Sequence, residues 1–106
     1  MRVLVQKVKK AKVFVSDQII SKIDKGLLIF LGVEDDDNEN DIEWLVKKII
    51  NLRIFNDSNR IMNFSVKDID GEILVVSQFT LMASTKKGNR PSYIKASGKY
   101  FAKKMY

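Results

Sequence analysis

Polar side chains interrupt an apolar stretch that is otherwise suited to the middle of a β-sheet. The stretch, residues 72–84, reads EILVVSQFTLMAS, and its interruptions are Ser77, Gln78 and Thr80. An unpaired polar group inside a buried strand costs roughly 1 to 3 kcal/mol, so either the fold or a ligand must pair these groups. A serine or threonine hydroxyl acts as a nucleophile only where an adjacent base activates it. The residues alone leave two interpretations open. Either the fold satisfies these polar groups, or they form a site for a ligand.

The absence of His and Cys limits the kinds of catalytic and metal-binding sites that the chain can form. With neither residue type in the sequence, one chain cannot form a Ser-His-Asp triad, a Cys-His pair or a zinc site with His or Cys ligands. Any catalysis must use carboxylates, Lys, Tyr, hydroxyls, backbone amides or the substrate itself. The five glycines match neither a dinucleotide fingerprint nor a phosphate-binding loop, which excludes nucleotide hydrolysis of those kinds.

An acidic run is a candidate cation site. Asp35, Asp37 and Glu39 have the alternate spacing of calcium ligands. However, Asn40 and Val46 stand where an EF-hand loop needs its glycine and its bidentate glutamate. We therefore expect no metal site, and we interpret the acidic residues as electrostatic partners of the helix that follows them.

That helix is the clearest element of the sequence. Asn38 is its expected N-cap, with Asp41 at the third helical position, and acidic residues suit the positive end of a helix dipole. Trp44 and the other aromatic residues lack the clustered spacing of an RNA-binding sheet, so we expect them in the core or at an interface. The apolar stripe at helical spacing consists of Ile42, Leu45, Val46, Ile49 and Ile50.

Strands are expected before the helix. Residues 2–8 alternate between apolar and polar types, with Val3 and Val5 on one side, and residues 11–16 continue the pattern. Residues 18–23 follow as a third strand. The unbroken run GLLIFLGV, residues 26–33, predicts a central strand that is buried on both faces.

A second group of strands is expected after the helix. Asp70-Gly71 is a two-residue hairpin signal, which makes residues 72–81 the return strand of a hairpin. We expect this strand to be buried and Phe79→Ala to unfold much of the domain. The apolar side chains expected out of solvent are Val75, Val76, Phe79 and Leu81.

A basic loop and a net positive charge suggest a polyanionic partner. Residues 83–92, ASTKKGNRPS, contain Gly88 and the only proline, flanked by Lys86, Lys87 and Arg90. The net charge of +6 favours nucleic acid, because Lys and Arg neutralise phosphates and release counterions. The alternative is a lysine-rich surface that is simply solvated.

The length of 106 residues predicts a single domain. Phe101 and Met105 have helical spacing, which predicts the start of a second helix, and we expect the natural domain to continue beyond Tyr106. No apolar run approaches the roughly 20 residues that cross a bilayer, and the N-terminus does not read as a signal peptide. We therefore expect a cytoplasmic protein without membrane contact.

Motifs along the whole chain carry a resemblance to a known family. They are GLLIFLGV (26–33), NLRIF (51–55), VSQFTL (76–81) and KKGNRPS (86–92). With them the chain resembles the D-aminoacyl-tRNA deacylases, also called D-tyrosyl-tRNA deacylases. The resemblance implies a homodimer with its site at the interface, no cofactor, and hydrolysis of the ester that joins a D-amino acid, or misplaced glycine, to the 3′ adenosine of tRNA. We expect an α+β fold, with a mainly antiparallel, barrel-like β-sheet, one long amphipathic helix and the start of a second.

The resemblance also implies roles for individual residues. Ser77, Gln78 and Thr80 are the implied catalytic residues, and Thr80 matches a residue once viewed in the family as a nucleophile. Because no His can activate Thr80, we expect a substrate-assisted route. In that route the 2′-hydroxyl of the terminal ribose assists hydrolysis and backbone N–H groups bind the oxyanion. The implied substrate-binding residues are Phe79, Met82, Lys86, Lys87, Asn89, Arg90 and Pro91.

The sequence departs from the family pattern in two places. The sequence contains no Gly-Pro dipeptide, whereas the family uses one with a cis bond to reject L-amino acids. Gln6-Lys7 stands where the family commonly has Gln-Arg, which replaces a planar bidentate donor with a point charge. The alternatives to a deacylase are a non-catalytic RNA-binding protein, an inactive remnant of the deacylase fold, and a protein-interaction module without an RNA partner.

Overall fold

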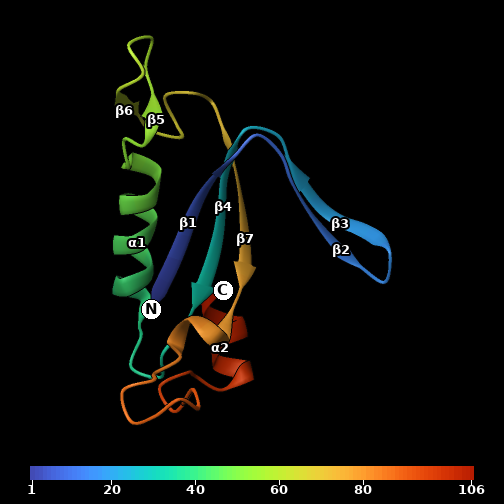
Figure 1. Ribbon diagram of the computed structural model, residues 1–106, viewed down its shortest axis with the longest axis vertical. Helices are drawn as coiled ribbons and strands as arrows, with labels where there is room; N and C mark the ends of the chain where they lie inside the picture. The colour runs from blue at the N-terminus through green and yellow to red at the C-terminus, as the bar shows by residue number, and fades with distance from the viewer.

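The computed structural model describes residues 1–106 as an α+β fold, which confirms the predicted class. Figure 1 shows strands β1, β4 and β7 in a sheet, with α1 beside it and the β2–β3 ribbon projecting from the opposite edge. The strands are β1 (Arg2–Val8), β2 (Ala11–Val15), β3 (Gln18–Ile23), β4 (Gly26–Gly32), β5 (Phe55–Asn56), β6 (Met62–Phe64) and β7 (Glu72–Ser77). The helices are α1 (Glu39–Asn51), the short 3-10 helix η1 (Phe79–Met82) and α2 (Lys99–Met105).

The three-stranded sheet has the order β1–β4–β7, so β4 is the central strand. It pairs with β1 in antiparallel fashion and with β7 in parallel fashion. The pairs β2–β3 and β5–β6 are antiparallel, so antiparallel pairing predominates as expected. The parallel pairing of β7 was not predicted, and it determines where the polar residues at the end of this strand lie.

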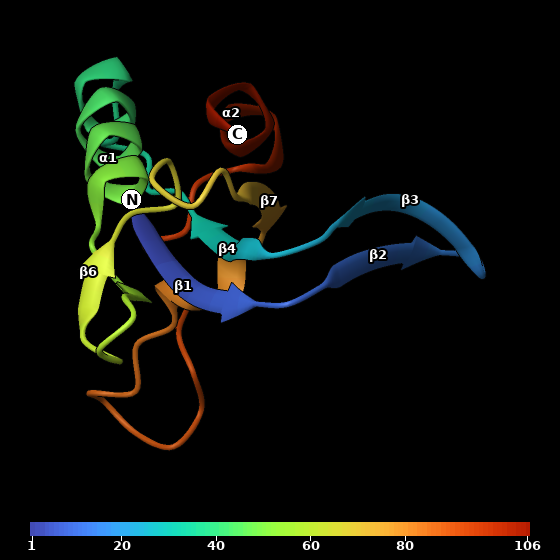
Figure 2. The same cartoon turned by 90° about the horizontal axis from the view of Figure 1, so that it is seen from above.

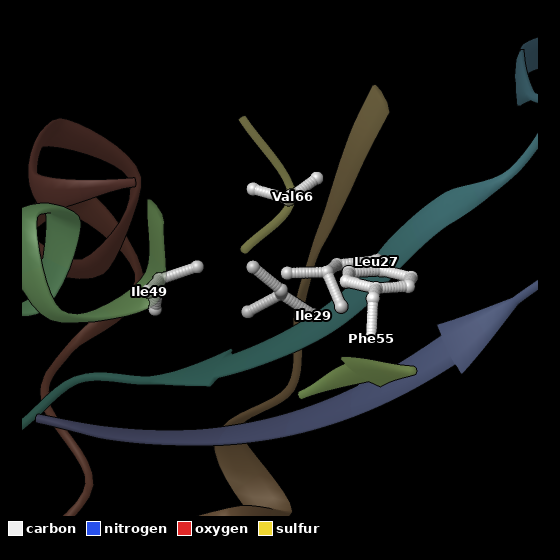
Figure 3. Packing of buried hydrophobic residues seen from close by; sticks show 5 residues of the cluster. All are labelled: Leu27, Ile29, Ile49, Phe55 and Val66. Carbon is white, nitrogen blue, oxygen red and sulfur yellow. The ribbon is translucent and has the colours of Figure 1, made fainter. Parts of the chain in front are cut away.

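The core forms where α1 and the segments after it cover one face of the sheet. Leu27 and Ile29 of β4 are 0% and 2% exposed, which confirms the predicted central strand. Figure 3 shows them facing the side chains of Ile49, Phe55 and Val66, with which they form one buried cluster. Each such side chain contributes about 1.5 to 3 kcal/mol through burial.

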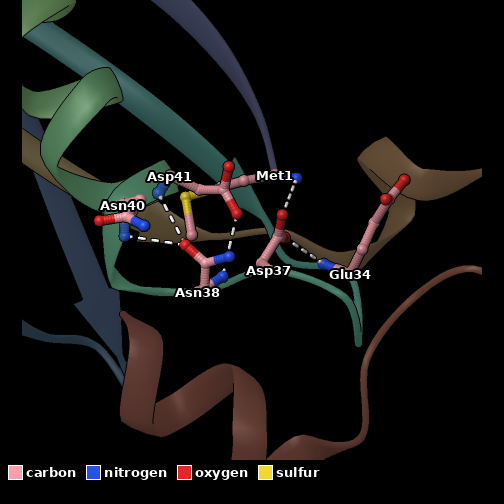
Figure 4. A network of polar contacts seen from close by, with 6 residues as sticks. All are labelled: Met1, Glu34, Asp37, Asn38, Asn40 and Asp41. Carbon is pink, nitrogen blue, oxygen red and sulfur yellow. Dashed lines mark hydrogen bonds and ion pairs between the residues drawn. The ribbon is translucent and has the colours of Figure 1, made fainter.

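The start of α1 confirms the predicted N-cap. Asn38 accepts hydrogen bonds from the backbone N–H groups of Asn40 (2.8 Å) and Asp41 (3.3 Å), while the carboxylate of Asp41 accepts from the Asn38 N–H (2.9 Å). This reciprocal arrangement is a capping box. Asp37, next to it, accepts from the Met1 ammonium group and from the Glu34 N–H, each at 2.7 Å (Figure 4). The acidic run thus fastens the N-terminus to the beginning of α1.

The apolar stripe of α1 only partly faces the core. Ile49 is buried and Leu45 packs against the core cluster. Trp44 is 62% exposed, so of its two expected positions, the core or an interface, the core is wrong. It lies beside Lys47 and Lys48 in a groove on the surface of the helix.

The predicted hairpin before β7 is wrong. Residues 65–71 instead form one helical turn, whose start is a second reciprocal cap between Ser65 and Asp68. These hydrogen bonds, the one from the Ser65 backbone foremost, hold the pKa of Asp68 below its ordinary value. The turn ends with Asp70 at φ 53° and with the Gly71 N–H bonded to the Val66 carbonyl at 2.9 Å, the pattern of a helix C-terminus. Asp70-Gly71 therefore ends a helical turn rather than joining two antiparallel strands.

The C-terminal residues form α2, which confirms the predicted second helix. The Tyr106 hydroxyl donates a hydrogen bond to the Val75 carbonyl and so fastens this end of the chain to β7. Neither α1 nor α2 is long and apolar enough to cross a membrane.

We predict that Gly26→Ala strongly destabilises the fold. Gly26 is paired with Glu72, and a Cβ atom on Gly26 would lie 1.8 Å from the Glu72 carbonyl oxygen, so one of the two backbones must move. We expect the free energy of unfolding in urea to fall by about 3 kcal/mol or more. Gly98→Ala is the matched control, because no atom lies within 4 Å of its added Cβ, and it should cost at most about 1 kcal/mol. Equal stability of the two variants would contradict the tight β4–β7 contact.

Candidate functional site

The chain turns sharply where β7 ends, and this turn places the polar residues. The Gln78 N–H donates to the Leu31 carbonyl (2.7 Å), and the Leu81 N–H donates back to the Gln78 carbonyl (3.2 Å). The strand therefore ends at Ser77 rather than at Leu81 as predicted, because the next residues coil into η1. This coiling leaves Phe79 59% exposed, which contradicts its predicted burial, and Leu81 is only half-buried.

The fold itself pairs two of the three polar residues that interrupt this stretch. The Gln78 side-chain amide donates to the Thr80 hydroxyl. The Ser77 side chain has no hydrogen-bond partner among the protein groups, and it is exposed at the rim of a cavity. The fold therefore satisfies Gln78 and Thr80, whereas a ligand contact of Ser77 stays a prediction.

The cavity lies between the end of β7, η1 and α2. Its volume is about 500 Å³. One wall is Phe79, whose ring meets that of Tyr93 edge to face, with 5.3 Å between the centroids. The lining residues are Ser77, Phe79, Ser97, Lys99, Ala102, Lys103 and Tyr106.

Ser97 is a candidate that the sequence did not reveal. Its hydroxyl oxygen is buried and has no hydrogen-bond partner, although its backbone N–H donates to the Val33 carbonyl at 2.9 Å. A buried hydroxyl without a partner carries a cost that a bound ligand can remove. Serine is too common for its position in the sequence to indicate this role, which depends on how the chain before α2 packs against β4.

The basic loop lies apart from this cavity. Figure 2 shows the loop on one side of the sheet and α2 on the other. Ser84 and Ser92 close the loop with two backbone hydrogen bonds of 2.8 Å. Met82 is 1% exposed and lies at the base of a groove that the loop and Arg2 also line. The Arg2 guanidinium donates a hydrogen bond to the Leu81 carbonyl at 3.1 Å. The predicted binding residues that are exposed on the loop are Lys86, Lys87, Asn89, Arg90 and Pro91.

The structure brings the predicted site residues to two places and leaves Gln78, Thr80 and Pro91 outside the lining of both. Ser77 and Phe79 line the cavity, whereas Met82 and the loop residues line the groove. The cavity holds two lysines and a tyrosine but no carboxylate or imidazole. It therefore offers hydrogen-bond donors, cationic groups and an aromatic face rather than a general base for a hydroxyl nucleophile.

Comparisons with known proteins agree on one family. The family model described as D-Tyr-tRNA(Tyr) deacylase matches residues 4–106. A D-aminoacyl-tRNA deacylase of Flavobacterium psychrophilum is 62% identical over 106 residues, which are 100% of this chain and 71% of the relative. A D-aminoacyl-tRNA deacylase of Parabacteroides distasonis is 60% identical over 106 residues, again 100% of this chain and 71% of the relative.

Solved structures show the same fold. One named "c-Myc DNA Unwinding Element Binding Protein" superposes with a TM-score of 0.93 at 39% identity and covers 100% of this chain and 71% of its own. A second, described as a probable eukaryotic D-amino acid tRNA deacylase, has a TM-score of 0.80 at 17% identity and covers 98% of this chain and 61% of its own. At 17% identity, the second structure shows only that the two chains share a fold.

We predict that Phe79→Ala leaves the domain folded, contrary to the expectation from the sequence. Because Phe79 is mostly exposed, its truncation should cost about 1 kcal/mol in urea unfolding. Met82→Ala is the matched comparison on the same 3-10 helix, and its burial predicts a loss of about 2 to 5 kcal/mol. A loss at Phe79 as large as that at Met82 would show that the ring is part of the core.

Proposed function

Because the chain belongs to the D-Tyr-tRNA(Tyr) deacylase family, we propose that it hydrolyses the ester of D-aminoacyl-tRNA and releases the D-amino acid and tRNA. The observation that carries this proposal is the family match over residues 4–106. The relatives named D-aminoacyl-tRNA deacylase support the same substrate. We place the activity in the cytoplasm, where tRNA is charged and used.

The cavity at the end of β7 is the proposed reaction site. In the reaction a water oxygen bonds to the ester carbonyl carbon, the bond to the ribose oxygen breaks, and that oxygen leaves with a proton. The Ser77 and Ser97 hydroxyls hydrogen-bond the substrate, and the exposed ring of Phe79 packs against it. The first N–H groups of η1 have no acceptor inside that helix, which suits them to a developing oxyanion.

The substrate supplies the group that the protein lacks. No imidazole or carboxylate side chain lines the cavity, so a hydroxyl of the protein has neither of these bases to activate it. The 2′-hydroxyl of the terminal ribose lies beside the ester and travels with it. Holding that hydroxyl, the ester and a water in a reactive geometry lowers the entropic part of the barrier.

The basic loop is the proposed contact for the tRNA body. Lys86, Lys87 and Arg90 are exposed there, and no acidic residue lines the groove beside them. Cations in this arrangement attract phosphates at a distance and orient the acceptor end.

We also infer a homodimer with the site near its interface. The supporting observation is a set of large apolar side chains that are exposed on the β2–β3 ribbon. Burial of such a surface against a second copy is favourable. The exposed residues are Phe14, Val15, Ile19 and Ile20.

Release of free D-tyrosine from D-tyrosyl-tRNA tests the activity. We expect the chain to release it faster than the ester hydrolyses in buffer, as measured with a labelled amino acid. A variant with Lys9 and Lys10 changed to Gln controls for nonspecific effects of charge, because both residues are exposed on the turn between β1 and β2, away from the cavity. Binding of the tRNA without release of the amino acid would instead support the non-catalytic alternative.

Thr80→Val separates the two possible nucleophiles. Val resembles Thr in shape but cannot attack an ester or accept the hydrogen bond from Gln78. In a substrate-assisted reaction we expect the rate of D-tyrosine release to fall roughly 10- to 100-fold, the effect of one or two hydrogen bonds. Ser58→Ala, which removes a hydroxyl from the exposed turn between β5 and β6, is the control and should leave the rate nearly unchanged.

The substrate provides the complementary arm of this experiment. A D-aminoacyl-tRNA that ends in 2′-deoxyadenosine and is charged on its 3′-hydroxyl should resist the unmodified protein. Rapid hydrolysis of this deoxy substrate, or an acyl group trapped on Thr80, would overturn the substrate-assisted mechanism while leaving the deacylase activity in place.

A further inference from the structure

A groove on the outer face of α1 has no role in the core or in the proposed reaction site. It has a volume of about 420 Å³, and it runs along the C-terminal half of the helix and just past its end. Figure 1 shows this end of α1 beside β5 and β6, at the opposite end of the sheet from η1 and α2. The lining residues are Trp44, Lys47, Lys48, Asn51, Leu52 and Arg53.

The indole of Trp44 is the apolar part of this groove. The side chain is 62% exposed, although burial of an indole is worth more than that of almost any other side chain. Only the ammonium group of Lys48 covers its face, 5.4 Å from the ring centroid. A lysine held there by a cation–π contact is exchanged easily, because such contacts at exposed sites are worth about 0.5 to 1 kcal/mol.

The charges of the groove have one sign. Three of its six lining residues, Lys47, Lys48 and Arg53, are cationic and none is acidic. Of the acidic residues of α1, Glu39 and Asp41 lie at the other end of the helix, and Glu43, next to Trp44 in the sequence, does not line the groove. The helix dipole explains a basic last turn, but it does not explain why an exposed indole stands among the cations.

Arg53 is held in position before any ligand binds. Its Nε donates to the Asn63 carbonyl at 2.8 Å, and its Nη2 donates to the Asn63 side-chain oxygen. These two hydrogen bonds fix the guanidinium plane, while its Nη1 has no protein partner. A fixed guanidinium loses less entropy when it contacts a phosphate.

We propose that this groove binds single-stranded nucleic acid, with an unpaired base stacked on Trp44 and the adjacent phosphates against Lys47, Lys48 and Arg53. Aromatic faces beside cations are the elements that single-stranded nucleic acids require, because every base has a π-face and every linkage carries a charge. The base takes the place of the Lys48 ammonium group over the ring, and that ammonium group moves to a phosphate. The site is separate from the ester chemistry and does not depend on it.

Trp44 is the only tryptophan of the chain, so its fluorescence reports on the groove directly. The experiment titrates the whole chain with an eight-residue oligouridylate and an oligothymidylate of the same length. We expect both to quench the fluorescence, because stacking brings a base onto the indole. The same sequence in a duplex should quench it far less, since its bases are already stacked on each other.

Variants measured by anisotropy of a labelled oligouridylate separate stacking from charge. Trp44→Leu, which preserves helix propensity, should weaken binding about tenfold without changing its salt dependence. The double change Lys47→Gln and Lys48→Gln should lower the slope of log K against log salt by about 1.4. The matched control is Lys9→Gln with Lys10→Gln, which removes the same charge from the turn between β1 and β2 and should leave the slope nearly unchanged.

Three results would overturn the proposal. The first is unchanged fluorescence at saturating oligonucleotide, and the second is equal affinity of Trp44→Leu and the unmodified chain. The third is equal quenching by polyglutamate, which would assign the groove to acidic peptides. Circular dichroism of each variant establishes that a loss of binding is not a loss of fold.

Discussion

The parallel pairing of β7 with β4 is the constraint on which the rest of the structure depends. Gly26 lies opposite Glu72 at one end of the pair, and Leu31 lies opposite Ser77 at the other. The Leu31 carbonyl then accepts the N–H of Gln78, which ends the strand and starts η1. This register fixes where the Ser77 hydroxyl, the ring of Phe79 and the Gln78–Thr80 hydrogen bond lie relative to the sheet. A slip by one residue would move every one of these groups to the other face.

The same pairing explains how the core is made. Two parallel strands cannot be joined by a tight turn, so the chain between β4 and β7 must cross over the sheet. The crossover contains α1, β5, β6 and the helical turn of residues 65–71. It contributes Ile49, Phe55 and Val66 to the cluster around β4. The connection that parallel pairing requires is therefore also the layer that buries the central strand.

Sequence patterns predicted the parts of this fold that depend on neighbouring residues. The reciprocal cap between Asn38 and Asp41 and the unbroken apolar run of β4 are examples. Asp70-Gly71 led to the wrong prediction of a hairpin, because a residue in the left-handed conformation followed by glycine suits both a hairpin turn and a helix C-terminus. Two features decided between these structures. One is the reciprocal cap between Ser65 and Asp68, which starts the helical turn, and the other is β4, which is distant in sequence and pairs with β7. The exposure of Phe79 and the unpaired hydroxyl of Ser97 likewise depend on contacts between distant segments, which no local pattern specifies.

The cavity at the end of β7 contains lysines and a tyrosine but no imidazole and no carboxylate side chain. In the substrate-assisted reaction that we propose, proton transfer falls to the substrate and to water, and the protein contributes through position. Position in turn requires that the hydrogen-bonding groups do not move when the substrate arrives. Gln78 lies between two lining residues of the cavity, Ser77 and Phe79, and it is held in place because its backbone bonds to Leu31 and its side chain to Thr80. Gln78 is thus tied to the central strand, and the rigidity of the sheet extends to Ser77 and Phe79 on either side of it, which line the cavity.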